Sequence, residues 1–241
     1  MSEKTVLRQQ FWNALREAGA ARFPGARGRI PNFVGAEASA ARLFASPEWQ
    51  RARRIKCNPD SPQRAVRKAA LEAGKVVYMA VPKLASARPF LELDPSVLPA
   101  KKLWHASSIK GAAELGRPVT LEEMPAIDLI VTGCVAVTRQ GARLGKGGGY
   151  SDLEYGLLRE AGKVRERTPI ATTVHPSQIA PDGAIPMTSH DISLDLIATP
   201  DELIGCPRPF ARPRGILWNE LEEAKREAIP VLRRKFLTRP D

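Results

Sequence analysis

Residues 54–82 predict a strand, a helix and a second strand in direct succession. The first strand covers residues 54–58 and ends in the turn-rich run NPDSP. Residues 63–73 carry alanine, valine and leucine at helical spacing and stop at Gly74. Residues 75–82 are a continuous apolar run, which is typical of a strand covered on both faces. Because parallel strands need a crossover of this kind, the unit predicts a parallel sheet with a right-handed connection.

Further segments of both kinds follow along the chain. Apolar runs predict strands at residues 127–132, 135–138, 168–174 and 192–199, and helical spacing predicts helices at 3–18, 36–43 and 105–115. In the last strand, Leu194, Leu196 and Ala198 alternate with Ser193, Asp195 and Ile197. Strands and helices that alternate in this way predict one layered α/β domain. We place it at residues 1–205, followed by a basic extension at 206–241 whose helix is interrupted by Pro230.

A glycine-rich stretch lies at residues 143–155 (RLGKGGGYSDLEY). Its glycines are Gly145, Gly147, Gly148 and Gly149. Glycines this dense cannot form helix or strand at reasonable cost, but they let successive main-chain N–H groups turn toward one point. Arg143 and Lys146 add cationic side chains to that concave surface. The stretch predicts a phosphate site, with a glycine hairpin carrying incidental cations as the alternative.

The residues after the glycines predict the start of a helix. Residues 151–154 (SDLE) match a capping box, and the apolar residues beyond them reach a stop at Gly162. The order differs from that of a P-loop, since Lys146 precedes the glycines. It also differs from a dinucleotide fingerprint, since Tyr150 stands in place of the last glycine.

Composition limits the partners and the compartment. The net charge of +11 favours nucleotides, polycarboxylates or nucleic acid, although an evenly solvated basic surface explains it equally well. Few aromatic residues accompany the basic runs, so nucleic acid is the minor alternative. We find no apolar run near the ~18 residues of a membrane span and no signal-peptide core in the first residues. Cys57, Cys134 and Cys206 are widely spaced, which predicts reduced, mostly buried thiols in a cytoplasmic protein.

Several charged residues are candidates for binding anions or metal ions. Lys4 and Arg8 are one helical turn apart on one face, so they either face water or hold an anion together. Asp60, Asp152 and Asp191 lie next to strands or helix starts, where open α/β sheets bind ligands. Mg²⁺ needs one or two such carboxylates together with phosphate oxygens. The alternative for each is an ordinary carboxylate in a turn or at a helix start.

Residues 143–152 (RLGKGGGYSD) resemble the R-L-G-x-G-x-G-Y-Y-D signature of 5-formyltetrahydrofolate cyclo-ligases, also called methenyltetrahydrofolate synthetases. The resemblance extends over most of residues 4–204. It includes KTVLR at 4–8, NPDSP at 58–62, DLIVTG at 128–133 and HDISLD at 190–195. The runs RIPNF at 29–33, CNPDSP at 57–62 and GGGYSDLEY at 147–155 are closer to a divergent branch, the methenyltetrahydrofolate-synthetase-domain-containing proteins.

The resemblance implies a three-layer α/β/α fold of the ribose-phosphate-isomerase and CoA-transferase type, with a mostly parallel sheet. It also implies conversion of 5-formyltetrahydrofolate to 5,10-methenyltetrahydrofolate with ATP and Mg²⁺, by a cytoplasmic monomer or weak dimer. The implied nucleotide-binding residues are Lys4, Arg8, Arg143, Gly145, Lys146, Gly147, Gly148, Gly149, Tyr150 and Asp152, with Arg143 and Lys146 as the catalytic cations. The implied metal ligands are Asp152 and Asp191, and the implied folate-binding residues are Asp60 and Tyr150.

Two positions depart from the family pattern. Ser151 replaces the second tyrosine of the signature, and Asp60 falls where the family usually has a glutamate. Because divergent paralogues of this family are associated with thiamine metabolism, a nucleotide-binding paralogue acting on a thiamine-related metabolite is the second hypothesis. An RNA-binding module, suggested by the net charge, is the third.

Overall fold

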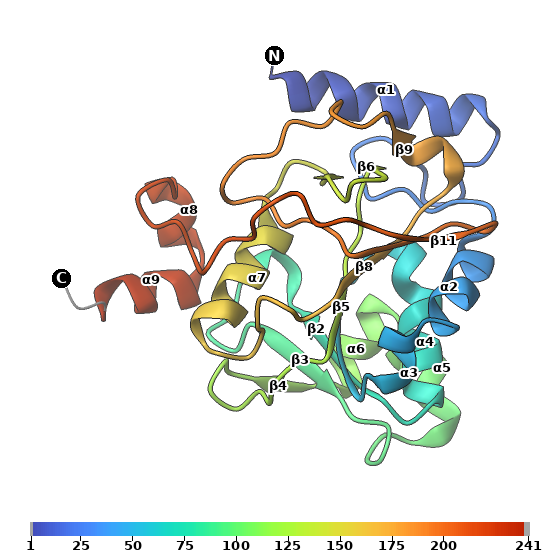
Figure 1. Ribbon diagram of the computed structural model, residues 1–241. Helices are drawn as coiled ribbons and strands as arrows, with labels where there is room; N and C mark the ends of the chain where they lie inside the picture. The colour runs from blue at the N-terminus through green and yellow to red at the C-terminus, as the bar shows by residue number, and fades with distance from the viewer. Residues whose placement is uncertain (1, 239–241) are drawn as a thin grey trace.

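An eight-stranded mixed sheet forms the centre of the computed structural model, which describes residues 2–238 (Figure 1). The strand order is β11-β10-β8-β5-β1-β2-β3-β4. These strands are β1 (Arg54–Cys57), β2 (Val76–Ala80), β3 (Phe90–Leu93), β4 (Arg117–Val119), β5 (Leu129–Val131), β8 (Ile170–Thr173), β10 (Leu196–Ala198) and β11 (Leu203–Gly205). The helices are α1 (Glu3–Glu17), α2 (Ala36–Phe44), α3 (Pro47–Arg51), α4 (Arg64–Glu72), α5 (Leu103–Ala106), α6 (Ile109–Leu115), α7 (Tyr150–Glu160), α8 (Glu223–Ala228) and α9 (Pro230–Leu237).

The strand–helix–strand unit predicted at residues 54–82 is confirmed as β1, α4 and β2. β1 pairs in parallel with β2 on one side and β5 on the other, with Ile55 opposite both Val77 and Leu129. β8 and β10 continue the parallel order, whereas the outer strands β11, β3 and β4 pair antiparallel. The carboxyl ends of the inner strands therefore lie along one edge of the sheet, where ligands bind in open α/β folds.

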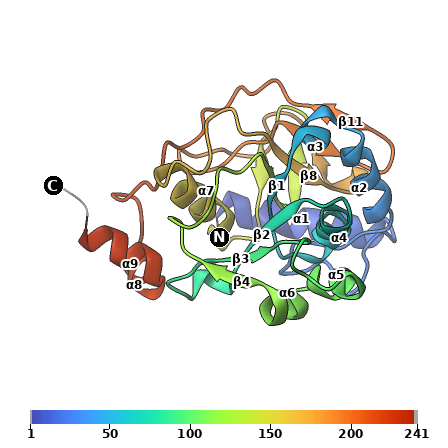
Figure 2. The same ribbon diagram turned by 90° about the horizontal axis from the view of Figure 1, so that it is seen from below.

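Alternate side chains of the inner strands pack into two separate cores, which confirms the three-layer α/β/α fold. Leu129 and Val131 of β5 pack with residues of α2 and α4, while Ile130 between them packs with Leu157 of α7. α2, α4 and α6 thus cover one face of the sheet and α7 covers the other (Figures 1 and 2). Burial of both faces explains why the inner strands are continuous apolar runs.

A small second sheet lies beyond the edge of the main one. It joins β6 (Ala136–Thr138) to β7 (Arg143–Leu144) and β9 (Ile179–Ala180). The prediction that residues 135–138 continue or pair beside the strand at 127–132 is therefore wrong, because these residues pair with β7 and β9 instead. Leu7 and Phe11 of α1 pack against this sheet, which places the N-terminal helix over β7 (Figure 1).

The capping box predicted at residues 151–154 does not form. α7 begins earlier, at Tyr150, behind a left-handed Gly149 that offers no side-chain cap. Because the glycine turn sets the helix start, Ser151 already lies inside the first turn, and its Oγ accepts a hydrogen bond from Asn58 at 2.8 Å. The predicted stop is confirmed, since the helix ends at Glu160 and Gly162 adopts φ 67°.

Two other predicted elements differ in extent. The strand predicted at 192–199 is reduced to Leu196–Ala198, because Asp195 turns inward to pair with Arg212 and Arg208. The expected alternation fails there, since Ile197 is buried and Leu196 only partly so. The helix predicted at 105–115 is two helices, α5 and α6, and Ser108 Oγ caps the second by accepting the Gly111 N–H.

The segment after β11 packs on the main core. Its side chains Ile216, Ile229, Val231 and Leu232 are buried in the cluster that also contains α7. The division of the chain at residue 205 stays a prediction, and Met1 and residues 239–241 lie outside the description. Cys57 and Cys134 are buried free thiols and Cys206 is a partly buried one. Within residues 2–238, the helices are too short or too polar to cross a membrane.

Candidate functional site

A cavity of ≈ 340 Å³ lies at the carboxyl ends of β1, β2 and β5. Its walls come from the turn after β1, the segments after β2 and β5, and the glycine-rich loop before α7. Of the residues proposed from the sequence, those that line it are Asp60, Arg143, Gly145, Lys146, Gly148, Gly149, Tyr150 and Asp152. The fold therefore brings the glycine-rich loop and the turn around Asp60 to one hollow.

The glycine-rich loop needs glycine at specific positions. Gly147 and Gly149 have φ angles of 105° and 66°, a left-handed conformation that other residues adopt only with strain. A Cβ on Gly147 would also lie 3.4 Å from the guanidinium carbon of Arg8. The loop ends at the N-terminus of α7, where free main-chain N–H groups favour an anion.

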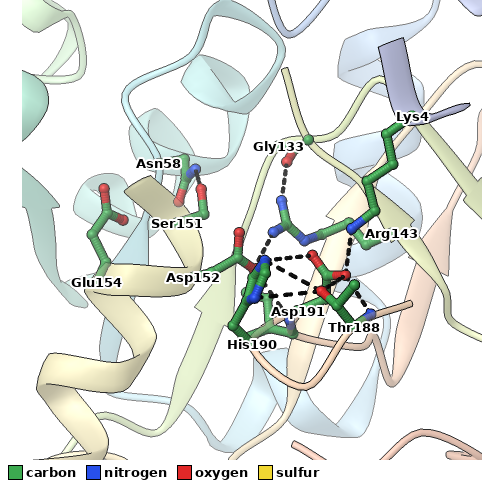
Figure 3. Close-up of polar contacts among 12 residues, drawn as sticks. Lys4, Asn58, Gly133, Arg143, Ser151, Asp152, Glu154, Thr188, His190 and Asp191 are labelled. Atoms are coloured by element: carbon green, nitrogen blue, oxygen red, sulfur yellow. Dashed lines mark hydrogen bonds and ion pairs between the residues drawn. The ribbon is translucent and has the colours of Figure 1, made fainter. Parts of the chain in front are cut away.

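A buried ion pair fixes the loop at both ends. Arg143 on β7 donates from Nη2 to Asp152 Oδ1 at 2.5 Å and from Nη1 to the Gly133 carbonyl at 3.3 Å (Figure 3). The main-chain N–H of Ile192 donates to the same Asp152 oxygen at 3.1 Å. Asp152 is therefore held by the start of the loop and by the segment that carries Asp191.

The two cations of α1 do not line the cavity but bind residues beside it. Lys4 Nζ donates to Asp191 Oδ2 at 2.5 Å, and Arg8 Nε donates to the Gly145 carbonyl at 2.7 Å. Thr188 also donates to Asp191, from its main-chain N–H and its hydroxyl, each at 2.7 Å (Figure 3). The alternative in which Lys4 and Arg8 simply face water is excluded. Burial acts to raise the pKa of Asp191, but the hydrogen bonds from Lys4 and Thr188 outweigh it and hold the pKa below its usual value.

Replacing Asp191 by asparagine is expected to lower the free energy of unfolding on the order of 1–3 kcal/mol near neutral pH, since charge-assisted hydrogen bonds are lost. A depressed pKa stabilises the folded state above the unfolded-state pKa, and the stabilisation disappears as pH falls through the folded-state value. The difference between wild type and Asp191→Asn, measured by urea unfolding, should therefore shrink below pH 3.8. The same change at exposed Asp201 serves as control, and a pH-independent difference would contradict the assignment.

The two predicted metal ligands converge, with Asp152 bonded to the N–H of the residue that follows Asp191. Within the described part of the chain, no group of three or more His, Cys, Asp or Glu side chains could hold a metal ion. Both carboxylates are paired with cations, Asp152 with Arg143 and Asp191 with Lys4. This donor set fits Mg²⁺ that arrives with a phosphate and takes its remaining oxygens from phosphate and water. It does not fit a metal held by protein alone.

Asp60 faces the cavity from a turn that a buried arginine holds. Lys146 Nζ approaches Asp60 Oδ1 at 3.4 Å across the opening. Arg67, buried in α4, donates to the main-chain carbonyls of Asn58, Pro59 and Asp60. Sequence reasoning missed Arg67, although it shares a helix face with buried Ala70 and Leu71. An arginine on the apolar face of a helix is the signal that could have identified it.

A second buried pair, also missed, lies at the cavity wall, which Glu154 lines and Lys56 supports from behind. Lys56 forms an ion pair with Glu154 and donates to Asn58 Oδ1 at 2.5 Å, and Asn58 in turn donates to Ser151. Figure 3 shows Glu154 on the α7 side of the Asn58–Ser151 contact. Burial raises the pKa of the Glu154 carboxyl, although the Lys56 ammonium opposes the shift. The lysine between Ile55 and Cys57, in an otherwise apolar strand, is the sequence signal that could have identified this pair.

Comparison with known proteins identifies the family of the chain and its fold. A sequence model of the 5-formyltetrahydrofolate cyclo-ligase family matches residues 1–200. A methenyltetrahydrofolate synthase domain-containing protein from Mus musculus is 36% identical over 234 residues, which cover 95% of this chain and 62% of the relative. The Homo sapiens protein of that name is 33% identical over 95% of this chain and 60% of its own length. The chain thus spans about three fifths of these relatives.

A solved structure shares the fold. The NMR structure of 5,10-methenyltetrahydrofolate synthetase from Aquifex aeolicus superposes with a TM-score of 0.55 at 18% identity, covering 87% of this chain and 96% of that one. At this level of identity the likeness concerns the arrangement of strands and helices alone.

Proposed function

The chain belongs to the 5-formyltetrahydrofolate cyclo-ligase family, and we propose that it uses ATP and Mg²⁺ to convert 5-formyltetrahydrofolate to 5,10-methenyltetrahydrofolate, or performs a close relative of this reaction. One observation carries the proposal. The glycine-rich loop, the cations of α1 and the carboxylates Asp152 and Asp191 meet at one place beside the ≈ 340 Å³ cavity.

The nucleotide half of the site consists of cations and main-chain N–H groups. In this proposal the N–H groups of Gly147, Gly148 and Gly149 would bind the phosphates, with Arg8, which contacts the Gly145 carbonyl, and Lys4 adding positive charge. Arg143 and Lys146 stabilise the negative charge on the phosphoryl group as it moves. Asp152 and Asp191 would hold Mg²⁺, which would neutralise charge on the phosphate oxygens. Phosphoryl transfer depends mainly on such positioning and electrostatics, so a site without a nucleophile suits it.

The proposed substrate half of the site lies across the cavity from the nucleotide half. In the proposed reaction the formyl oxygen of the folate takes the terminal phosphoryl group of ATP, and ADP leaves. The neighbouring folate nitrogen then attacks the formyl carbon and loses its proton, the carbon–oxygen bond breaks, and phosphate leaves with that oxygen and takes up the proton. Asp60 and Tyr150 both line the cavity, which supports the role in folate binding proposed for them. Asp60 is held in position by Arg67 through its own carbonyl.

Formation of the methenyl product, followed by its absorbance, tests the proposal. We expect product only when ATP, Mg²⁺ and 5-formyltetrahydrofolate are all present. Lys146→Ala should lower kcat/KM about tenfold, less than the ~10²–10³ typical of a buried donor, because this lysine is half exposed. Lys101→Ala, an exposed change on a distant segment, is the matched control. Absence of product from folded wild-type protein would reject the folate reaction.

A second candidate is a nucleotide-binding paralogue that acts on a thiamine-related metabolite. Its support is the polar wall of Asn58, Ser151 and Glu154, backed by Lys56, where Ser151 replaces the tyrosine of the family signature. Titration by calorimetry separates the two candidates. Binding of ATP and of a thiamine phosphate without binding of 5-formyltetrahydrofolate would favour the paralogue.

A further inference from the structure

The C-terminal segment reaches the glycine-rich loop. A second cavity of ≈ 190 Å³ lies between the start of α7 and residues 215–225, and Gly149 and Asp152 line it as they line the first cavity. Figure 1 shows α8 and α9 beside α7, on the side away from α2 and α4. The residues that close this cavity fall beyond residue 200, where the match to the family ends.

Lys225 of α8 lies directly over the loop. Its Nζ is 5.6 Å from the centre of the Tyr150 ring, and a Cβ on Gly149 would come within 3.2 Å of that nitrogen. Within the described residues, the ion pairs formed from α8 involve Arg226, which binds Glu223 and Glu227. Lys225 therefore presents a positive charge to the last glycine of the loop and to the N-terminus of α7.

This position is held by the packing of the segment. Ile216 lies so close to α7 that a Cβ on Gly156 would come within 2.7 Å of its Cδ1. Glu160 Oε1 accepts hydrogen bonds from the Ile216 N–H at 3.1 Å and from Trp218 Nε1 at 2.8 Å. Ser189 Oγ donates to Glu220 at 3.1 Å, which joins the segment to the residues around Asp191. The segment that leads into α8 and Lys225 is thus anchored to α7 and to the residues around Asp191.

We propose that Lys225 is a further nucleotide-binding residue, which contacts the phosphate chain of a nucleoside triphosphate from the side opposite Lys4 and Arg8. The inference rests on the proposed function, because it concerns the same anion site. An ammonium group at this position adds a charge-assisted contact to an anion already bound by main-chain N–H groups. It also means that the segment after residue 205 completes the site.

Calorimetric titration of ATP with Mg²⁺ into the full chain tests this inference. We expect Lys225→Ala to weaken binding roughly tenfold, as for the loss of one hydrogen bond to a charged group, and Lys225→Arg to retain most of the affinity. Arg226→Ala is the matched control on the same helix and should bind ATP as wild type does. Thermal melting of each variant checks that it is folded.

The outcomes separate this inference from the proposed function. If wild type binds ATP and Lys225→Ala binds it equally well, the role of Lys225 is rejected while the nucleotide site stands. Equal weakening by Lys225→Ala and Arg226→Ala would also reject it, because the effect would then come from α8 as a whole. Failure of wild type to bind ATP would reject the proposed function and this inference with it.

Discussion

Replacing Lys56 by methionine is expected to lower the free energy of unfolding by about 3–5 kcal/mol, because it leaves the Glu154 carboxylate buried without its partner. The side chains of Lys56 and Glu154 are only 3% and 6% exposed. A charge taken out of water at this depth is tolerated only when an opposite charge and hydrogen bonds compensate it. Methionine fills much of the space of the lysine stem, so the loss of charge dominates the effect.

Urea unfolding measures this change. The double variant Lys56→Met/Glu154→Leu should recover most of the loss, since an apolar pair can replace a buried ion pair at little cost. Lys68→Met, which breaks an exposed pair with Glu72, should cost less than ~1 kcal/mol. A loss in Lys56→Met no larger than in Lys68→Met would contradict the account.

The same variant has a pH dependence of known sign. Burial raises the pKa of Glu154, and removal of Lys56 takes away the charge that opposes the shift. The folded state of Lys56→Met then binds a proton that the unfolded state, with the usual carboxyl pKa near 4.5, has already released. Its free energy of unfolding should therefore rise as pH falls toward 4.5, relative to wild type.

Replacing Asp152 by asparagine is expected to lower kcat/KM for formation of the methenyl product about 10²–10³-fold, as for loss of one electrostatic contact in a reacting site. Asparagine keeps an oxygen that can accept from Arg143 and from the Ile192 N–H, so the loop geometry is retained. What is lost is the negative charge proposed to hold Mg²⁺ and to orient Arg143. Raising the Mg²⁺ concentration should restore part of the activity.

Asp128 provides a matched control for this variant. Its carboxylate also accepts main-chain N–H groups, those of Arg53 and Arg54 at 2.9 and 2.8 Å, but it precedes β5 and so lies at the opposite edge of the sheet. Asp128→Asn should leave the activity of the folded protein unchanged. Equal activity in Asp152→Asn and Asp128→Asn would remove the metal role proposed for Asp152.

The fold was predictable where local pattern and tertiary packing agree. Residues 54–82 have apolar runs bounded by turn residues, and the structure buries both strands on two faces. The local pattern and the packing therefore indicate the same strand–helix–strand unit. The prediction for residues 192–199 failed because Asp195 is drawn inward by Arg208 and Arg212, which lie in the segment after β11. Period-two alternation assumes that polar side chains face water, and it cannot anticipate such partners.

The site was predictable where its residues follow the family signature. Lys4, Arg8, Asp191 and the glycine-rich loop lie together, although their roles stay a proposal. Lys56, Glu154 and Arg67 were missed because buried charges are rare, and Lys56 and Glu154 are in addition far apart in sequence. Lys225 was missed for a different reason. Nothing in the sequence of the short helix α8 indicates which of its two cations, Lys225 or Arg226, points toward the body of the protein.

The central claim is that main-chain N–H groups of residues 145–149, with cations from α1 and β7, cradle the phosphates of ATP. Amide resonances of uniformly ¹⁵N-labelled protein test it most directly, by comparison of spectra before and after addition of ATP with Mg²⁺. The account predicts that the largest shifts fall on the amides of Gly147, Gly148 and Gly149, and that they saturate at one nucleotide per chain. Shifts absent from these glycines, or concentrated on the far side of the sheet around α4, would contradict it.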